Sequence, residues 1–342
     1  MNSTKPIIAI TMGDPGGSGP EIDLKVVRND EIRSKANLLL IGDFKTFEKA
    51  SVTTGTRNLK LRKIADPSEM VDESSTINIL DLGNVDFSKL VYGKASALGG
   101  RASYECIAKA VACAIAGDVH AIVTAPISKE SLNLAGYHYP GHTELLADLT
   151  HTKEVKMMLV AGSFKVAHVT THVSMRKALD LIKKERVLNT IELTYQSLVN
   201  LFGIPQPKIA ISGLNPHAGE NGLFGDEEIN EISPAISEAC SRGMGVLGPF
   251  PPDTVFYRAY YKKKMDVDAV IAMYHDQGHI AMKMVGFMDG VNMSLGLPII
   301  RTSPDHGTVW GKAGQGIADE NATAEATKLA IELANKKFKL IK

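Results

Sequence analysis

Hydrophobic and polar positions follow two different periods along most of this chain. Short apolar runs of strand length predict buried strands at residues 7–12, 38–41, 77–80, 121–124, 157–160, 166–170, 208–211 and 269–273. Between them, apolar residues recur with the helical period and predict helices, notably at residues 102–116, 185–202, 229–241 and 322–337. Because buried strands alternate with helices, we expect an α/β fold with a largely parallel sheet.

The domain organisation follows less directly from this pattern. A length of 342 residues predicts about two domains, but no linker rich in Pro, Gly or Ser separates them. From about Pro126 to Pro304, the loops become dense in His, Asp, Asn, Gly and Pro. Ligands bind outside the carboxyl ends of parallel strands, so we expect these loops to contain the chemistry, in two domains with a cleft between them.

Charge and composition exclude several classes of protein. Lys plus Arg number 38 and so do Asp plus Glu; this balance argues against a general nucleic-acid or anionic-membrane surface, which needs a net basic face. No window reaches the roughly 18 apolar residues of a membrane span, and the first apolar run is unlike a signal peptide. Three scattered cysteines are too few for a disulfide framework or a cysteine metal site, and Cys106 and Cys113 fit one buried helix face. We therefore expect a soluble, cytoplasmic protein.

Three histidines follow predicted strands at the point where each strand meets a loop: His172 after Val169-Thr170-Thr171, His217 in Asn215-Pro216-His217, and His275 after Met273-Tyr274. Three neutral imidazoles with open positions for substrate are a familiar catalytic arrangement around a divalent cation. Each histidine alone is better explained as a hydrogen-bonded structural residue, but the set favours a metal site.

Two carboxylates accompany these histidines. Asp276 directly follows His275, and Asp253 lies in Pro251-Pro252-Asp253-Thr254. A carboxylate near a metal can bind it, orient a ligating imidazole or take a proton, and the sequence leaves these roles open. Asp253 would alternatively make a good helix N-cap.

An anion-binding set is expected from Lys283, Asn292 and Arg301. Arg301 follows the apolar pair Ile299-Ile300 into a polar loop, where its guanidinium could bind a phosphate or carboxylate through two hydrogen bonds. Taken singly, Lys283 and Arg301 are better explained as surface cations or salt-bridge partners.

Two glycine-rich stretches could approach an anion or nucleotide with backbone N–H groups. The first, residues 13–21, opens a predicted helix after the first strand; it matches neither the GxGxxG fingerprint nor a P-loop, and a tight structural turn explains it equally well. The second, residues 305–321, adds the imidazole of His306 and the carboxylate of Asp319 to its backbone donors.

Taken together, these motifs resemble the NAD-dependent 4-phosphohydroxythreonine dehydrogenase family of vitamin B6 synthesis, with its branch of D-threonate or D-erythronate 4-phosphate dehydrogenases. The residues GENGLFGDEE and PPDTVF look more like that acid-sugar phosphate branch. The resemblance spans nearly the whole chain in family order through MGDPGGSGPEI (12–22), PGHTELLA (140–147), TTHVSMRKAL (170–179), GLNPHAGENGLFGDEE (213–228), GPFPPDTVF (248–256), AMYHDQGHIAMK (272–283) and GVNMSLGLPIIRTSPDHGT (290–308).

This resemblance implies a fold like that of isocitrate and isopropylmalate dehydrogenases, in a homodimer whose active site lies at the dimer interface. The implied domains are residues 1–130 with 302–342, containing the cofactor loop, and residues 131–301, containing the metal and substrate residues and the dimer interface. The chain departs from the family pattern at Gly16, Gly17 and Ser18, and again around Trp310 and Asp319.

Carried over by position, the resemblance also implies roles for individual residues. His172, His217 and His275 would bind the metal, one of them from the partner subunit. Substrate would contact His142, Thr143, Lys283, Asn292 and Arg301, and Asp253, Asp276 and Lys283 would be the catalytic candidates. NAD would contact His306, Gly307, Thr308 and Asp319.

The implied reaction is NAD-dependent oxidation, with decarboxylation, of a four-carbon 3-hydroxy acid phosphorylated at its far end. One divalent metal per site is expected; ligation by histidine alone suits Zn²⁺ or Co²⁺ better than Mg²⁺. Two alternatives are a metal-dependent phosphatase or other hydrolase, which would need no nucleotide, and a non-catalytic protein that binds anionic metabolites.

Overall fold

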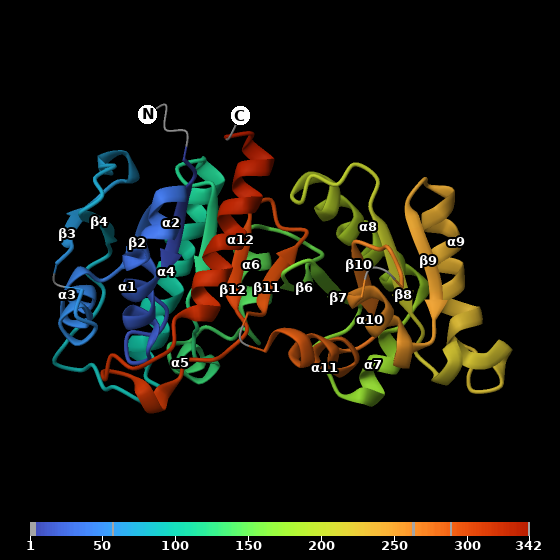
Figure 1. The fold of residues 1–342 in the computed structure, drawn as a ribbon. Coiled ribbons are helices and arrows are strands. Elements are labelled where there is room, and N and C mark those ends of the chain that lie inside the picture. Colours follow the sequence, from blue (N-terminus) through green and yellow to red (C-terminus); the bar gives the residue numbers. More distant parts are fainter. Residues whose placement is uncertain (1–4, 57, 262–263, 288, 341–342) are drawn as a thin grey trace. The chain divides into compact units, whose positions relative to one another are not determined.

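The structure, a computed structural model, describes residues 5–56, 58–261, 264–287 and 289–340. The chain divides into two compact units (Figure 1). Unit 1 comprises Met1–Val155 and Leu297–Lys342, and unit 2 comprises Lys156–Gly296. Both units are of the α/β type, which confirms the expected fold class.

Unit 1 is built on parallel strands. In spatial order they are β3 (Lys60–Ile64), β4 (Thr76–Asp81), β2 (Asn37–Gly42), β1 (Ile7–Thr11), β5 (Ala121–Thr124) and β12 (Arg301–Pro304). Every pairing among these neighbours is parallel, so their carboxyl ends lie at one edge of the sheet. The helices of this unit are α1 (Gly19–Arg28), α2 (Asp30–Lys35), α3 (Phe44–Thr53), α4 (Ala97–Ala116), α5 (Lys129–Leu134), α6 (His142–Leu149) and α12 (Asn321–Phe338).

Unit 2 has a mixed sheet. Its spatial order is β11 (Val291–Leu295), β6 (Lys156–Ala161), β7 (Phe164–His168), β10 (Ala269–Ala272), β8 (Lys208–Ser212) and β9 (Gly245–Phe250). Strand β6 runs antiparallel to both β11 and β7. Its pairing with β7 is antiparallel because the short turn at Gly162 (φ 56°) reverses the chain directly into β7. Strands β7, β10, β8 and β9 are parallel. The helices are α7 (Met175–Leu181), α8 (Lys184–Asn200), α9 (Ser233–Ser241), α10 (Pro252–Tyr260) and α11 (His275–Gly286).

The core of unit 1 explains where its first boundary lies. The core of unit 1 includes Ile107 of α4 and Ile122 of β5, together with Leu145 and Leu146 of α6. Helix α6 therefore belongs to unit 1, and the boundary lies at residue 155 rather than at the expected residue 130. The second boundary lies at residue 296 rather than at 301, so Arg301 is part of unit 1, as are His142 and Thr143 because of the first boundary.

Two further sequence expectations can be compared with the structure. Cys106 and Cys113 are buried on α4, as predicted from their shared helix face. Over the residues that the structure describes, no helix is both long and apolar enough to cross a membrane.

Candidate active site

The three histidines predicted to bind metal follow three adjacent parallel strands. In unit 2, β10 pairs with β7 on one side and with β8 on the other. His172 follows β7, His275 begins α11 after β10, and His217 follows β8 within the short helical segment Pro216–Gly222. The three strand-to-loop junctions therefore lie at the same edge of the sheet.

His172 and His275 lie side by side, with ring centroids 5.6 Å apart. Both line a cavity of about 340 Å³, together with Thr171 and residues of α7. Backbone pairing extends past the ends of the strands, because Thr170 N–H donates to the Met273 carbonyl (3.2 Å). This pairing holds the segment before His172 beside the segment before His275.

Asp276 determines which nitrogen of His275 is available. Its Oδ1 atom lies 2.6 Å from Nδ1 of His275. When the carboxylate accepts the Nδ1–H proton, the lone pair remains on Nε2, which is the arrangement found where a carboxylate orients a metal-ligating histidine. Asp253, in contrast, is exposed in the first turn of α10, where Pro251 occupies the N-cap position, so the alternative of Asp253 as an N-cap is wrong.

His217 does not complete a metal site within one chain. Its ring lies near Phe224, with centroids 6.0 Å apart, and the residue is exposed. No group of three or more His, Cys, Asp or Glu side chains among the described residues could hold a metal ion. A single chain thus brings together two of the three predicted ligands, and ligation by His217 stays a prediction that requires a second copy.

The turn that contains His217 has an unusual backbone. Residues 217–221 all have positive φ, at 55°, 54°, 82°, 44° and 56°. Left-handed conformations cost L-residues about 1–2 kcal/mol each, and only the third of these positions is glycine. Strain of this kind persists where surrounding contacts enforce it and is concentrated at functional sites.

Sequence reasoning missed a row of imidazoles behind His275. The ring of His279 stacks on His275 at 3.6 Å with an interplanar angle of 11°, and His168 lies 4.8 Å beyond His279. Burial, followed by the nearby His279, lowers the pKa of His168 to about 3, so this ring is neutral. The spacing of His275 and His279 by one helical turn was a signal that could have revealed the stack.

Gln277 was also missed, and it joins two of the loops. Its Oε1 accepts from Met273 N–H (2.7 Å), and its Nε2 donates to the Gly213 carbonyl (2.9 Å). One side chain therefore links the start of α11 to the loop after β8, which leads to His217.

Unit 1 contributes a buried cation at the first position of β12. Arg301 is 2% exposed, and its Nε and Nη2 donate to Thr124 Oγ1 at 3.1 and 2.7 Å. Burial lowers the pKa of Arg301 to about 9, which still leaves the guanidinium charged at neutral pH. The alternative of a surface cation is therefore wrong for Arg301.

His142 and Thr143 begin helix α6 of the same unit. Burial, with the Arg301 charge as the second cause, holds the pKa of His142 well below its usual range. A neutral His142 can accept or donate a hydrogen bond beside the Arg301 charge. Its Nε2 is shielded and makes no hydrogen bond to the described residues.

The other two predicted substrate residues lie in unit 2. Asn292 is on β11, where its Nδ2 contacts Sδ of Met157 at 3.1 Å, while its Oδ1 is shielded and has no hydrogen-bond partner within the described ranges. Lys283 is on α11, with Nζ 5.3 Å from the centroid of the Phe287 ring.

The two glycine-rich stretches meet at the start of α1. Ser18 donates from its backbone N–H to the Thr308 carbonyl (3.2 Å) and from Oγ to the Val309 carbonyl (2.9 Å). Gly17 is closely covered, since a Cβ there would lie 3.1 Å from the Thr308 carbonyl oxygen. Ser18, at which the chain departs from the family pattern, thus contacts the two residues directly before Trp310, where a second departure begins.

The predicted cofactor residues lie along this second stretch. Nδ1 of His306 is 2.9 Å from the carbonyl oxygen of Gly307. Asp319 Oδ1 accepts from Asn321 N–H (2.8 Å) at the start of α12. Glu21 binds the same stretch from α1, since its Oε1 accepts from Gly316 N–H at 3.1 Å.

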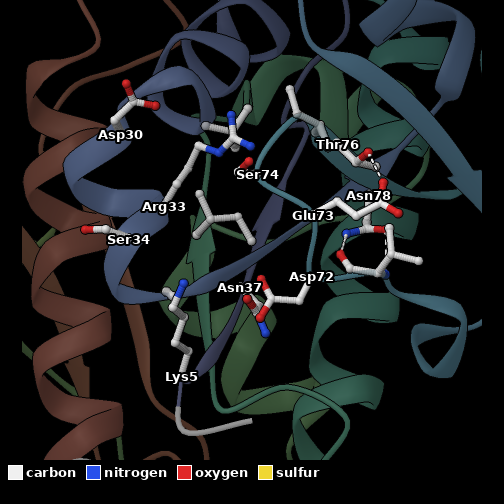
Figure 2. Close-up of a pocket in the computed structure, with 15 residues that line it drawn as sticks. Lys5, Asp30, Arg33, Ser34, Asn37, Asp72, Glu73, Ser74, Thr76 and Asn78 are labelled. Atoms are coloured by element: carbon white, nitrogen blue, oxygen red, sulfur yellow. Dashed lines mark hydrogen bonds between the residues drawn. The ribbon is translucent and has the colours of Figure 1, made fainter.

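A separate cavity of about 440 Å³ lies at the amino ends of β2 and β4 (Figure 2). Figure 2 shows basic and acidic side chains around the same space, including Lys5, Arg33, Asp72 and Glu73. No predicted site residue lines it. Because parallel sheets bind ligands at the carboxyl ends of their strands, this cavity is not the candidate site.

Two known proteins are similar to this chain over nearly its whole length. The chain is 46% identical to the D-threonate 4-phosphate dehydrogenase of Salmonella typhimurium, over 96% of this chain and 98% of the relative. It is 44% identical to the crystal structure of a 4-hydroxythreonine-4-phosphate dehydrogenase from Klebsiella pneumoniae, with a TM-score of 0.89 over 96% of this chain and 100% of the other.

A more distant likeness concerns the fold alone. Isocitrate dehydrogenase from Methylococcus capsulatus is 12% identical, with a TM-score of 0.50 over 98% of this chain and 87% of that enzyme.

A family model described as pyridoxal phosphate biosynthetic protein PdxA matches residues 34–330. The chain therefore belongs to the PdxA family.

Proposed function

We propose that this protein is an NAD-dependent dehydrogenase that oxidises and decarboxylates a 4-phosphorylated four-carbon 3-hydroxy acid. The names of its relatives support a dehydrogenase of this substrate class. The structural observation that supports it best is the pair of imidazoles, His172 and His275, with Asp276 on Nδ1 of the second. In the reaction, hydride passes from C3 to NAD⁺ and the hydroxyl proton is released. The resulting β-keto acid then loses carbon dioxide by cleavage of the C1–C2 bond, and C2 takes up a proton to give a phosphorylated ketone.

The donor set suits a divalent cation, with zinc as the first choice. Two adjacent imidazoles, one hydrogen-bonded to a carboxylate, would supply two ligands of a three-histidine site, and we propose that His217 of a second copy is the third ligand. A bound cation would stabilise the negative charge that develops on the substrate oxygen during oxidation and decarboxylation.

A homodimer is supported by an apolar stripe on α11. Ile280, Met284 and Phe287 are 65%, 81% and 72% exposed, and their helical spacing places them on one face. Exposed apolar side chains that gather on one face are typical of a surface that binds another protein. The stripe begins five residues after His275, so a second copy bound there would contact the helix that starts with this predicted ligand.

The chain's own residues would hold the substrate and move its proton. Arg301, held by its hydrogen bonds to Thr124, would bind an anionic end of the substrate. Lys283 would add a second positive charge, and His142, Thr143 and Asn292 would hydrogen-bond the polar groups. Asp276 and Asp253 are the proton-acceptor candidates. The stretch from His306 to Asp319 would hold NAD.

A panel of three substrates tests this function. NADH formation should be followed with 4-phospho-D-threonate, 4-phospho-D-erythronate and 4-phosphohydroxy-L-threonine, and carbon dioxide release should be followed in parallel. The acid-sugar motifs favour the first two. Release of inorganic phosphate without NAD reduction would instead indicate a hydrolase, and tight binding without turnover a metabolite-binding protein.

The metal role of His217 gives a first mutational prediction. His217→Ala should remove metal-dependent turnover and weaken zinc binding about tenfold or more, because a ligand is lost. Its thermal unfolding midpoint without metal should match the wild type, since the side chain is exposed. Zinc affinity measured by calorimetry checks this. Wild-type affinity in the variant would remove His217 from the site.

A further inference from the structure

Glu228 is a carboxylate buried beside the turn that contains His217. It begins the π-helical turn Glu228–Ile232 and is 3% exposed. A buried carboxylate is expensive unless hydrogen bonds compensate for its lost hydration. Its contacts therefore show what the charge does in the folded protein.

All the hydrogen bonds found for this carboxylate come from the start of the His217 loop. Oε1 accepts from the backbone N–H groups of Leu214 and Asn215, both at 2.7 Å. Oε2 accepts from the Asn215 side chain at 2.9 Å. Bonds from neutral donors to a buried charge are stronger than ordinary ones, so the carboxylate fixes the chain two residues before His217.

Two glycines show how closely the loop surrounds Glu228. A Cβ at Gly213 would lie 3.1 Å from Oε1, and a Cβ at Gly219 would lie 2.8 Å from Oε2. The carboxylate therefore contacts the loop on both sides of His217.

This anchoring acts on a backbone that L-residues do not adopt readily. His217, Ala218, Glu220 and Asn221 all have positive φ. A turn of this kind needs contacts from outside it, and Ala218 N–H donates back to the Asn215 carbonyl (3.0 Å), the same residue that Glu228 binds.

We propose that Glu228 is a positioning residue that fixes the left-handed turn at residues 217–221 and thereby sets the direction of the His217 imidazole. This inference rests on the proposed metal role of His217. Glu228 itself would touch neither metal nor substrate.

The test compares Glu228→Gln with Glu227→Gln. Both residues accept from the Asn215 side chain, at 2.9 and 2.7 Å, but only Glu228 binds the backbone of the loop. Chelator-treated full-length protein would be titrated with Zn²⁺ by calorimetry. Hydrogen exchange of residues 214–222 and thermal unfolding without metal would be measured on the same samples.

We expect Glu228→Gln to weaken zinc binding about tenfold or more and to speed exchange in residues 214–222. Glu227→Gln should change neither quantity. Activity of Glu228→Gln should return at excess Zn²⁺, which a general folding defect would not allow. If Glu228→Gln folds poorly, Glu228→Asp keeps the charge and should give an intermediate zinc affinity.

Three results would overturn the proposal. The first is wild-type zinc affinity in both Glu228 variants while His217→Ala loses it, which leaves the proposed function intact. The second is an equal loss in Glu227→Gln, which would indicate a general charge effect. If His217→Ala itself keeps wild-type affinity, the proposed ligand role fails, and this inference fails with it.

Discussion

A guanidinium inside a β-strand is costly, and Arg301 is 2% exposed at the first position of β12. Thr124 on the neighbouring strand accepts two of its hydrogen bonds. The same charge lowers the pKa of His142 and so helps to keep that imidazole neutral. At the residue scale, burial and, second to it, the Arg301 charge together favour a neutral His142.

Arg301→Lys should raise KM for the phosphorylated acid about tenfold or more, because an ammonium cannot bind Thr124 and an anion through a planar fork at once. Steady-state kinetics with the preferred substrate check this. Arg33→Lys, at the cavity of Figure 2, is the matched control and should leave KM unchanged. An unchanged KM in the Arg301 variant would place substrate binding elsewhere.

Asp23 gives a prediction about pH. Burial raises the pKa of this carboxyl well above its usual value, so the folded state keeps the proton that the unfolded chain releases above about pH 4. The contribution of Asp23 to the free energy of unfolding is therefore favourable at low pH and is lost as pH rises toward the folded pKa. Asp23→Asn should make the free energy of unfolding depend less on pH and should raise Tm at pH 8 relative to wild type. Parallel Tm–pH curves for the two proteins would contradict this.

At the scale of elements, apolar runs predicted eight strands, β1, β2, β4, β5, β6, β7, β8 and β10, and missed β3, β9, β11 and β12. Strand β3 (Lys-Leu-Arg-Lys-Ile) was missed because its side chains are largely polar and partly exposed, and β12 because its buried residues are Arg301, Thr302, Ser303 and Pro304. The antiparallel β6–β7 pair was missed because both strands are buried and read like parallel ones.

The candidate site was predictable to a similar extent. His172 and His275 could be found because each directly follows an apolar run. His168 could not, because it lies inside such a run and sequence alone does not show that its ring faces His279. The left-handed turn at residues 217–221 was hidden as well, since non-glycine residues with positive φ leave no compositional signal.

Helix α11 can approach β7 only because residue 278 lacks a side chain. A Cβ there would lie 2.3 Å from Nε2 of His168. Gly278→Ala should therefore lower the free energy of unfolding by about 1–3 kcal/mol and weaken zinc binding by displacing His275. Gly311→Ala, with open space around the added methyl group, is the control. Denaturant unfolding and zinc titration check both, and equal effects of the two changes would contradict the packing argument.

At the scale of the whole molecule, the apolar stripe on α11 should control assembly. Met284→Glu is expected to shift the protein from dimer to monomer in sedimentation velocity, because it places a charge in an apolar interface. Zinc affinity should fall with it, since the third ligand comes from the second copy. Ile115→Glu, on an exposed face of α4, should leave both unchanged. A monomeric wild type with full zinc affinity would refute the dimer.

The order of the chain in unit 1 has a consequence for synthesis. Unit 2 leaves the ribosome complete while unit 1 still lacks β12 and α12. Strand β12 pairs with β5, and helix α12 packs against both strands. A nascent chain that stops before residue 297 can therefore complete only unit 2, which contains His172 and His275. Arg301, which we propose to bind an anionic end of the substrate, is made late, together with the strand β12 that completes the sheet of unit 1. Prematurely terminated products should therefore lack this proposed binding residue.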